Sequence, residues 1–297
     1  MISIDGHTVE FQTFPNGETR LIHNDPIFGF HADGWIDKAV FKYESDADLI
    51  KLMIFKRYLD VRRINLKTLI ISYMPYSRMD RSENDSPFTL KYVSEFINNL
   101  NFISIVVIEP HSDVTCALLN NAKASYINFH LIDIVKSSVS FNDNKDYLVF
   151  PDAGAKKRYS KMKSKNILFC DKVRDFNTGD ISRLDLIGDI SEAKGKNAII
   201  VDDLCSYGGT FIATADRLRE AGFNNVYLLV AHAENAIFEM NEKTGKQLFQ
   251  YIGKIFTTNS LLSKHNNIEN KRFEPKLVVY DVESLIPLLV VKGDTSV

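Results

Sequence analysis

Short apolar and β-branched runs alternate along this 297-residue chain with stretches whose apolar positions recur at helical spacing. Most of the runs are continuously apolar rather than alternating, which is typical of strands buried on both faces of a sheet. Strands are predicted at residues 68–73, 103–108, 146–150, 167–170, 198–201, 226–231 and 277–280. Strand–helix alternation of this kind predicts an α/β fold with mostly parallel sheets and helices on both faces.

Two helices are predicted in some detail. The first begins after Ser45 as N-cap, and its expected buried face is formed by Ile50, Met53, Ile54, Tyr58 and Val61. The second covers residues 210–220 and ends near Gly222. At roughly 100–200 residues per domain the length predicts two domains, with the boundary where Ser, Asn and Asp cluster near residues 133–145. We expect domains at residues 1–138 and 139–297.

Composition narrows the functional classes. The hydrophobic fraction of 45%, the charged fraction of 25% and the net charge of −2 are those of an ordinary globular chain. The near-neutral balance, without a long basic stripe, argues against a nucleic-acid partner. The longest apolar runs, such as residues 285–291, are too short to cross a bilayer. Three widely spaced cysteines have neither metal-ligand nor disulfide-framework spacing, so we expect a cytoplasmic protein.

The most specific motif is VDDLCSYGGTF at residues 201–211, which follows an apolar strand and leads into a helix. The strand end presents two adjacent carboxylates, Asp202 and Asp203, which can bind sugar hydroxyls directly or through a divalent cation. Gly208 and Gly209 allow a close approach of the backbone to an anion. Thr210 stands where a helix N-terminus favours phosphate. An ordinary strand–helix turn would explain either pair alone, but not the full order.

This order resembles the phosphoribosyl-diphosphate loop shared by type I phosphoribosyltransferases and ribose-phosphate pyrophosphokinases. The resemblance implies that the loop binds the ribose and its 5-substituent. The residues so implied are Asp202, Asp203, Ser206, Tyr207, Gly208, Gly209 and Thr210.

Two N-terminal segments resemble the nucleotide-binding stretches of the pyrophosphokinases alone. The segment FPNGETRL at residues 14–21 is similar to one whose phenylalanine stacks on adenine, which implies ATP-binding roles for Phe14, Asn16 and Glu18. The segment MPYSRMDR at residues 74–81 is similar to one that places an arginine beside the nucleotide, which implies ATP contacts for Arg78 and Met79.

Three further segments resemble parts of the same family that lie close to the chemistry. IEPHSD implies that His111 binds ATP and its magnesium, and PDAGAKKR implies that Asp152 lies at the ribose and metal site. DKVRD carries Lys172 and Arg174, which match the pair that opens the family's catalytic loop. Each residue alone has an ordinary structural explanation. Six segments in family order favour the functional interpretation.

The resemblance implies two tandem phosphoribosyltransferase-like domains, with ATP on the side of residues 1–138 and the ribose on the side of residues 139–297. It also implies an enzyme that transfers the β,γ-diphosphate of ATP to the C1 hydroxyl of a 5-substituted ribose, with Mg²⁺ as cofactor. The implied assembly is a homodimer or homohexamer. Positioning and charge stabilisation suffice for such a transfer, so no nucleophilic side chain is required.

Two departures from the family pattern bear on the substrates. Met79 stands where the family has a glutamine, and a thioether cannot donate a hydrogen bond. Ser206-Tyr207 stands where the family usually has Asp-Thr. We expect ribose 5-phosphate as the acceptor, with phosphoribosyl diphosphate and AMP as products. The Tyr207 ring leaves ADP-ribose open as an alternative acceptor, with a product that belongs to NAD-related metabolism.

Two other functions stay open at this point. A phosphoribosyltransferase would share only the 201–211 loop and would not explain the N-terminal segments. A non-catalytic regulatory homologue would be expected to lose catalytic-loop or metal residues, which this chain keeps.

Overall fold

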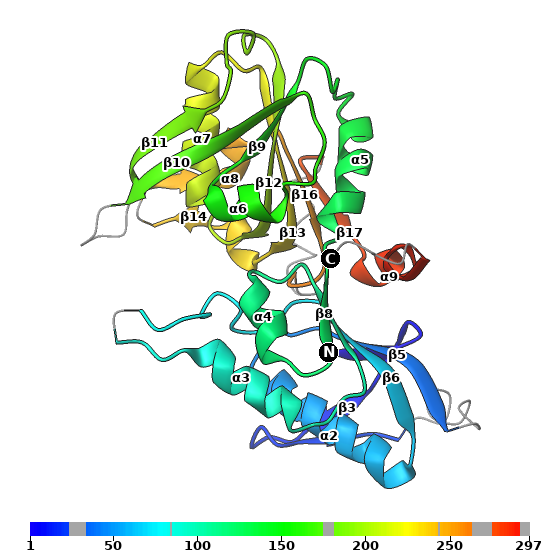
Figure 1. The fold of residues 1–297 in the computed structure, drawn as a ribbon. Helices are drawn as coiled ribbons and strands as arrows, with labels where there is room; N and C mark the ends of the chain where they lie inside the picture. Colours follow the sequence, from blue (N-terminus) through cyan, green and yellow to red (C-terminus); the bar gives the residue numbers. More distant parts are fainter. Residues whose placement is uncertain (24–33, 84, 175–180, 243, 263–274, 292–297) are drawn as a thin grey trace. The chain divides into compact units, whose positions relative to one another are not determined.

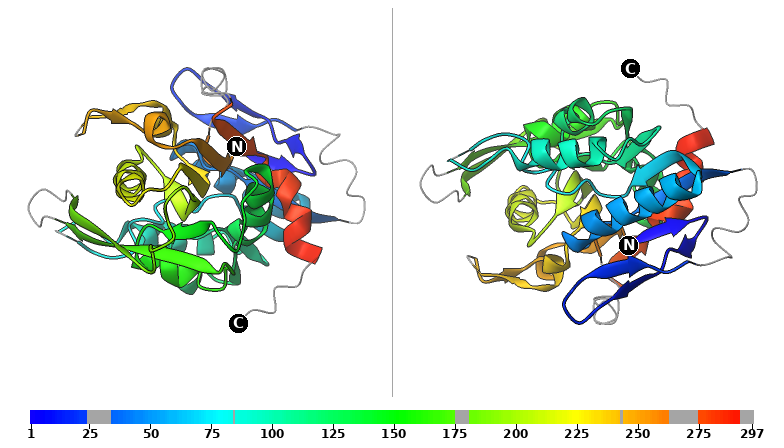
Figure 2. Two further views of the ribbon diagram at one scale, coloured as in Figure 1. Left: turned by 90° about the horizontal axis from the view of Figure 1, so that it is seen from above. Right: turned by 90° about the horizontal axis from the view of Figure 1, so that it is seen from below.

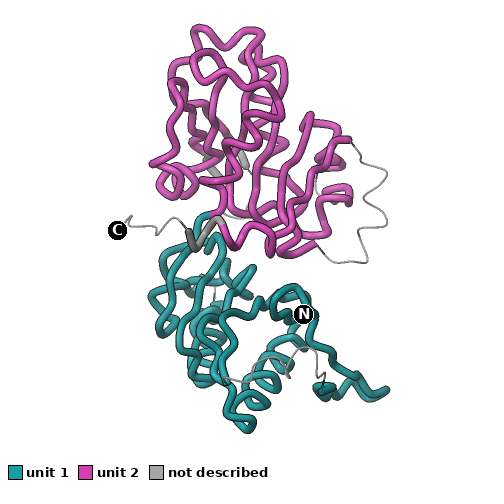
Figure 3. Tube along the Cα trace, turned by 90° about the vertical axis from the view of Figure 1, so that its right-hand side faces the viewer, with its two compact units in different colours: residues 1–126, 289–297 teal, residues 127–288 magenta. Residues whose placement is uncertain are grey.

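The computed structural model describes residues 1–23, 34–83, 85–174, 181–242, 244–262 and 275–291 (Figure 1). The chain divides into two compact units (Figure 3). Each unit has a hydrophobic core of its own. Unit 1 comprises Met1–Tyr126 with Leu289–Val297, and unit 2 comprises Ile127–Leu288. The sequence-based domains at residues 1–138 and 139–297, with their ATP and ribose sides, stay a prediction.

The described part of unit 1 contains a sheet, a separate hairpin and three helices. Its elements are β1 (Ile2–Ile4), β2 (His7–Thr8), β3 (Phe11–Thr13), β4 (Thr19–Leu21), β5 (Trp35–Phe41), α2 (Ala47–Arg62), β6 (Asn65–Ile71), α3 (Thr89–Asn98), β7 (Ile105–Ile108), α4 (Asp113–Leu118) and β8 (Ala122–Ser125). The strand order is β2-β1-β5-β6-β7-β8, with β5 to β8 parallel and β1 and β2 antiparallel at one edge. β3 and β4 form the separate antiparallel hairpin, drawn in blue in Figure 2.

The buried face of α2 differs from the predicted one. The helix has Asp46 rather than Ser45 as its N-cap, and it buries Leu52, Phe55 and Leu59 completely. Ile50 is 47% exposed and Val61 is 82% exposed, so the predicted stripe was wrong at these positions. The reason lies in the first two turns, where apolar residues occur around most of the helix and spacing alone does not select one face.

Unit 2 is built around a larger, mostly parallel sheet. Its described elements are α5 (Asn128–Ser138), β9 (Tyr147–Phe150), α6 (Ala153–Arg158), β10 (Asn166–Arg174), β11 (Ile181–Ile187), β12 (Asn197–Cys205), α7 (Gly209–Glu220), β13 (Asn225–Ala233), η1 (Asn235–Phe238), β14 (Met240–Asn241), β15 (Lys246–Gln247), α8 (Leu248–Tyr251), β16 (Lys254–Thr258), β17 (Leu277–Tyr280) and α9 (Val282–Val291). The strand order is β11-β10-β9-β12-β13-β16-β17, and only the β10–β11 pair of the described sheet is antiparallel.

All seven predicted strands are confirmed, as β6, β7, β9, β10, β12, β13 and β17. The second predicted helix is α7, and its end at Gly222 is confirmed. Gly222 has a φ of +94°, its N–H donates to Arg219 O, and the N–H of Phe223 donates to Leu218 O. These two bonds satisfy the last carbonyl groups of the helix, as in a Schellman motif. No helix in the described part of the chain is long and apolar enough to cross a membrane.

The chain order of unit 2 creates a reversal in the sheet between β9 and β12. These strands pair in parallel, with Ile200 opposite Val149, while β10 continues on the outer side of β9 and β13 on the outer side of β12. In open α/β sheets, ligands bind at the carboxyl ends of the strands where the order reverses in this way. A ligand site is therefore expected in the segment after Phe150 and at the last residues of β12, from Asp202 onward.

The corrected face of α2 predicts the effect of truncating its side chains. Leu52→Ala is expected to lower the free energy of unfolding by about 2–5 kcal/mol, because it leaves a cavity in a fully buried position. Ile50→Ala, two residues away on the exposed side, should change it by less than about 1 kcal/mol. Urea unfolding of both variants measures the difference. Equal losses would return Ile50 to the core.

Candidate functional site

Two adjacent aspartates lie near the end of β12, at the reversal of the sheet. The Asp202 and Asp203 side chains are 14% and 5% exposed, so both carboxylates are largely withdrawn from water. One guanidinium nitrogen, Nη1 of Arg158, donates to Asp203 Oδ1 at 2.8 Å and to Asp202 Oδ1 at 3.2 Å. The backbone N–H of Asp203 also donates to Asp202 Oδ1, at 2.9 Å. The pair therefore forms one charged cluster with the last residue of α6.

The electrostatic state of Asp202 reflects this crowding. Burial raises the pKa of its carboxyl well above the ordinary aspartate value, and the neighbouring Asp203 carboxylate raises it further. Asp152 acts in the same direction, whereas the Arg158 guanidinium opposes the rise. Two buried like charges cannot both stay ionised at low cost unless a cation is close to them. Arg158 is that cation among the described residues that contact the pair.

A second set of contacts fixes the backbone of Asp202 at the end of β12. Asn128, from α5, donates through Nδ2 to the carbonyl oxygen of Asp202 at 2.8 Å and to the Tyr159 hydroxyl at 3.0 Å. Asn128 and Tyr159 are both fully buried, and the Tyr159 ring stacks on Phe150 at the end of β9, with centroids 6.1 Å apart. The end of β12 is thus tied to α5 and to the residue that follows α6.

Asp152 begins α6, directly after β9. Its side chain accepts a hydrogen bond from the Ala155 N–H at 2.9 Å, which makes it the N-cap of this short helix. Because β9 and β12 are parallel neighbours, Asp152 and the Asp202–Asp203 pair lie towards the same edge of the sheet, and the charge of Asp152 acts on Asp202. The helix cap is an observed contact, whereas the ribose and metal role of Asp152 stays a prediction.

The loop after the acids leads into α7 through a glycine that the local packing requires. Gly208 is the N-cap of α7 with a φ of +77°, and a Cβ added there would lie 2.6 Å from Leu248 Cδ1. The first N–H groups of an α-helix have no partner within the helix, so its start favours an anion. The segment that contains Ser206, Gly209 and Thr210 therefore has the backbone form expected of a phosphate loop.

Tyr207, next to this glycine, is partly exposed and lies in acidic surroundings. Its side chain is 39% exposed. The Glu239 carboxylate, which follows η1, raises the pKa of the Tyr207 phenol, with smaller contributions from burial and from Glu242 and Glu234. Tyr207 therefore lies on an acidic side of the loop.

Lys172 and Arg174 occupy the last residues of β10, and their side chains lie outside the described part of the structure. The backbone places Lys172 opposite Leu184 of β11, with a bulge between Val173 and Arg174. β10 pairs with β9 only as far as Phe169 and then continues with β11 as an antiparallel arm (Figure 2). The predicted catalytic pair therefore stands on an extension beyond the carboxyl end of β9, the end that leads to Asp152.

In unit 1, two of the predicted nucleotide-binding residues follow neighbouring parallel strands. Arg78 and the 49% exposed Met79 come after β6, and His111 comes after β7. Each stretch contains a non-glycine residue in the left-handed region, Tyr76 at a φ of +61° and Glu109 at +43°. Such conformations persist only where the surroundings enforce them, and they are frequent at binding sites.

Tyr76 is held in this conformation by the segment that starts α2. Its hydroxyl donates to Asp46 Oδ1 at 2.6 Å, and the Tyr43 hydroxyl donates to the same oxygen at 2.7 Å. These two hydrogen bonds lower the pKa of the Asp46 carboxyl. Because Asp46 uses its side chain in this way, it makes no side-chain cap bond to α2.

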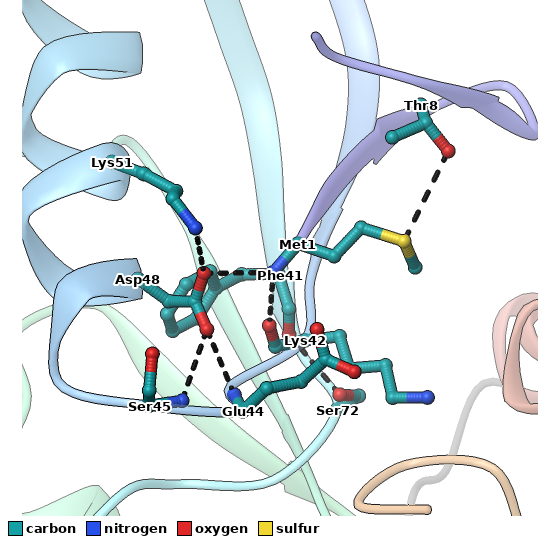
Figure 4. Close-up of polar contacts among 9 residues, drawn as sticks. All are labelled: Met1, Thr8, Phe41, Lys42, Glu44, Ser45, Asp48, Lys51 and Ser72. Atoms are coloured by element: carbon teal, nitrogen blue, oxygen red, sulfur yellow. Dashed lines mark hydrogen bonds and ion pairs between the residues drawn. The ribbon is translucent and has the colours of Figure 1, made fainter. Parts of the chain in front are cut away.

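Asp48 holds the turn between β5 and α2 through hydrogen bonds to its backbone (Figure 4). Its Oδ2 atom accepts the N–H groups of Glu44 and Ser45 at 3.0 and 3.1 Å, while Oδ1 contacts Lys51 Nζ at 3.0 Å and the Met1 ammonium at 3.3 Å. Burial alone would raise the pKa of Asp48, but the ammonium group, Lys51 and the Glu44 N–H together lower it. The turn between β5 and α2 is therefore anchored by a buried charged group.

The predicted adenine-binding residues lie on the β3–β4 turn. The Phe14 ring is 38% exposed, with the Arg20 guanidinium 5.6 Å from its centroid. The Phe14 N–H donates to Glu18 O at 2.8 Å, and the Glu18 N–H donates to Asn16 Oδ1 at 3.2 Å. Asn16 thus supports the turn itself, and the ring is accessible as a stacking surface. The adenine role of this turn stays a prediction.

The structure brings together some of the predicted residues. Asp152, Asp202, Asp203 and the 206–210 loop gather at one edge of the unit 2 sheet, and Arg78 and His111 follow adjacent strands of unit 1. His111 and Asp152 belong to different units, so their common metal role stays a prediction. Sequence reasoning missed Arg158 and Asn128 as parts of the site. Charge balance could have indicated Arg158, because two acids at the end of a buried strand require a nearby cation.

The close contact at Gly208 yields a stability prediction. Gly208→Ala should cost about 1–2 kcal/mol for the left-handed backbone and a further 1–3 kcal/mol for the overlap with Leu248. Gly245→Ala, at a φ of +63° with open space around it, should pay only the first amount. Urea unfolding of the two variants isolates the cost of the contact. Losses of equal size would mean that Leu248 yields to a Cβ without cost.

Comparison with known proteins supports one family. No family model matches the chain. The ribose-phosphate pyrophosphokinase of Mycoplasmopsis pulmonis is 27% identical over 298 residues, covering 95% of this chain and 84% of that protein. The ribose-phosphate pyrophosphokinase of Aquifex aeolicus is 28% identical over 294 residues, covering 93% and 84%.

A solved structure agrees on the fold. The phosphoribosylpyrophosphate synthetase of Mycobacterium smegmatis superimposes with a TM-score of 0.70 at 20% identity, covering 94% of this chain and 87% of that one. The two sheets therefore have the phosphoribosyltransferase-like arrangement that the sequence predicted. The chain is therefore similar over most of its length to ribose-phosphate pyrophosphokinases, which are transferase enzymes, and it shares the fold of a phosphoribosylpyrophosphate synthetase.

Proposed function

We propose that this protein transfers the β,γ-diphosphate of ATP to the C1 hydroxyl of ribose 5-phosphate, giving phosphoribosyl diphosphate and AMP. The observation that carries the proposal is the buried Asp202–Asp203 pair at the sheet reversal, followed by a glycine-initiated helix. Vicinal hydroxyls suit adjacent carboxylates, and a 5-phosphate suits a helix N-terminus. The names of the curated relatives support the same reaction.

Mg²⁺ fits the chemistry of this donor set. The ion binds through one or two carboxylates and substrate phosphates, and it keeps several waters rather than occupying an all-protein cage. The described residues contain no group of three or more His, Cys, Asp or Glu side chains that could hold a metal by themselves, which agrees with this mode. Asp152 would hold the ion on the ribose side, and His111 on the ATP side. When bound, the ion neutralises charge on the phosphate oxygens.

The chain's own residues then have separate tasks. Asp202 and Asp203 orient the ribose by accepting hydrogen bonds from its 2- and 3-hydroxyls. The N–H groups of residues 208–210 hold the 5-phosphate. The C1 hydroxyl oxygen loses its proton to solvent and bonds to the β-phosphorus, while the bond between the β-phosphorus and the oxygen that bridges to the α-phosphate breaks. Lys172 and Arg174 offset the charge on the transferred group. AMP leaves with the α-phosphate.

Binding of ATP falls to the N-terminal segments in this proposal. The exposed Phe14 ring provides the stacking surface for adenine, with Asn16 and Glu18 beside it on the turn. Arg78 lies after β6 and supplies positive charge for the nucleotide phosphates. The assembly into homodimers or homohexamers is proposed from the family resemblance alone.

An AMP-release assay with ATP, Mg²⁺ and ribose 5-phosphate tests the reaction. The wild-type protein should release AMP without any added base, which distinguishes it from a phosphoribosyltransferase. Lys172→Ala should lower kcat by about a hundredfold or more, because one donor to the transition state is lost. Lys165→Ala, at an exposed position of the same region, is the matched control and should be unaffected. Normal turnover of Lys172→Ala would refute its role.

One observation favours a second acceptor, ADP-ribose. Tyr207 is exposed beside the phosphate loop, and Glu239 and its neighbours give that side negative charge. A phosphate monoester carries nearly two charges at neutral pH, whereas each phosphate of a diphosphate diester carries one. A nucleoside attached through a diphosphate also offers hydroxyls to carboxylates and a base to the Tyr207 ring.

The two acceptors make opposite predictions for Tyr207→Thr. If the ring selects the larger acceptor, this variant should lose kcat/KM for ADP-ribose by about tenfold or more and keep or gain it for ribose 5-phosphate. Tyr251→Thr, elsewhere in unit 2, serves as a control for a general effect of removing an aromatic ring. The ratio of the two kcat/KM values decides the matter. An unchanged ratio would mean that Tyr207 has no part in acceptor choice.

A further inference from the structure

We propose that Arg158 is a positioning residue for the ribose: its guanidinium fixes the Asp202 and Asp203 carboxylates side by side in the arrangement that receives the sugar hydroxyls. This inference rests on the function proposed above, because it assigns the task of the two acids to the ribose. It adds Arg158, whose positive charge balances the carboxylates of the two ribose-binding acids.

The geometry singles out one atom. Nη1 of Arg158 lies 2.8 Å from Asp203 Oδ1 and 3.2 Å from Asp202 Oδ1, so a single donor bridges the two side chains. The Arg158 side chain is only 10% exposed, and its guanidinium carbon lies 5.7 Å from the centroid of the Tyr159 ring. A guanidinium in such a place is fixed by its surroundings rather than free to sample solvent.

The shared contact with Arg158 also determines the orientation of the two carboxylates. Adjacent residues on an extended strand direct their side chains to opposite faces of the sheet. Asp202 and Asp203 would therefore diverge if the strand alone placed them. At the end of β12 the shared contact with Arg158 brings one oxygen of each to the same nitrogen, and the Asp203 N–H holds the Asp202 oxygen from its other side.

The origin of Arg158 links this bridge to the neighbouring strand. Arg158 ends α6, the helix that Asp152 begins as N-cap after β9. The next residue, Tyr159, accepts a hydrogen bond from Asn128, which also holds the Asp202 carbonyl. One short helix thus connects the carboxylate after β9 with both carboxylates and the backbone at the end of β12. Movement of α6 would disturb the acids and their spacing together.

A positioning role has a different signature from a purely structural one. Loss of the bridge should weaken binding of the sugar while leaving ATP, which the proposal assigns to the N-terminal segments, almost unaffected. A structural role would impair both ligands equally, and a direct role in the transition state would lower kcat without changing sugar affinity. The test therefore uses binding as well as turnover.

Calorimetric titration of Arg158→Gln and Arg158→Lys with ribose 5-phosphate in the presence of Mg²⁺, and separately with ATP, provides the measurement. Arg158→Gln should bind ribose 5-phosphate at least tenfold more weakly and ATP within twofold of wild type. Arg158→Lys should be intermediate, because it keeps the charge but not the planar fork. Lys161→Gln removes a charge from an exposed position three residues away and should match wild type.

The outcomes separate this inference from the proposed reaction. Unchanged sugar affinity in both Arg158 variants, or equal loss for sugar and ATP, overturns the positioning role even if the wild type releases AMP. Weaker sugar binding in the variants supports it even if the wild type releases no AMP. If Arg158→Gln does not fold, Arg158→Lys decides: selective weakening supports the role, and wild-type affinity overturns it. The same titration with ADP-ribose applies if that is the acceptor bound.

Discussion

The site depends on one electrostatic constraint: two adjacent carboxylates are withdrawn from water near the end of a buried strand. Asp202 and Asp203 repel each other there, and burial adds to the cost of ionising them. Arg158 meets the constraint with one buried guanidinium that contacts both. Arg158 ends α6 and Asp152 begins it, so this contact ties the helix that carries Asp152 to the end of β12.

The topology of unit 2 explains why these groups can meet at all. β9 and β12 are far apart in sequence but adjacent in the sheet, because the chain leaves β9 in one direction and returns to place β12 on its other side. The carboxyl ends of both strands therefore open on the same edge. In unit 1, the parallel strands β6 and β7 are also neighbours in the sheet, although here they are consecutive in sequence. Arg78 follows β6 and His111 follows β7, so both come after the carboxyl ends of adjacent strands.

How much of this could be predicted from the sequence varies with the kind of signal. Strands such as β12 and β13 were predictable because burial on both faces leaves a continuous apolar run. β5 was missed because Asp37 and Lys38 interrupt its apolar residues. The face of α2 was predicted wrongly because apolar residues surround its first turns. Arg158 lay within a recognised segment, but its partners are 44 and 45 residues away, and no local pattern encodes such a contact.

Carboxylates lie close to both Arg158 and Tyr207, near the loop that follows the acids. The charge of the two aspartates is met by a buried arginine. Tyr207 stands beside Glu239, with Glu234 and Glu242 contributing to a negative field. Carboxylates therefore lie close to the loop at both places. In the proposed function, positive charge for an anionic acceptor would come from the helix start, from bound Mg²⁺ or from the arm of β10 that carries Lys172 and Arg174. We propose that the balance between these three sources and the negative field around Tyr207 determines which acceptor binds.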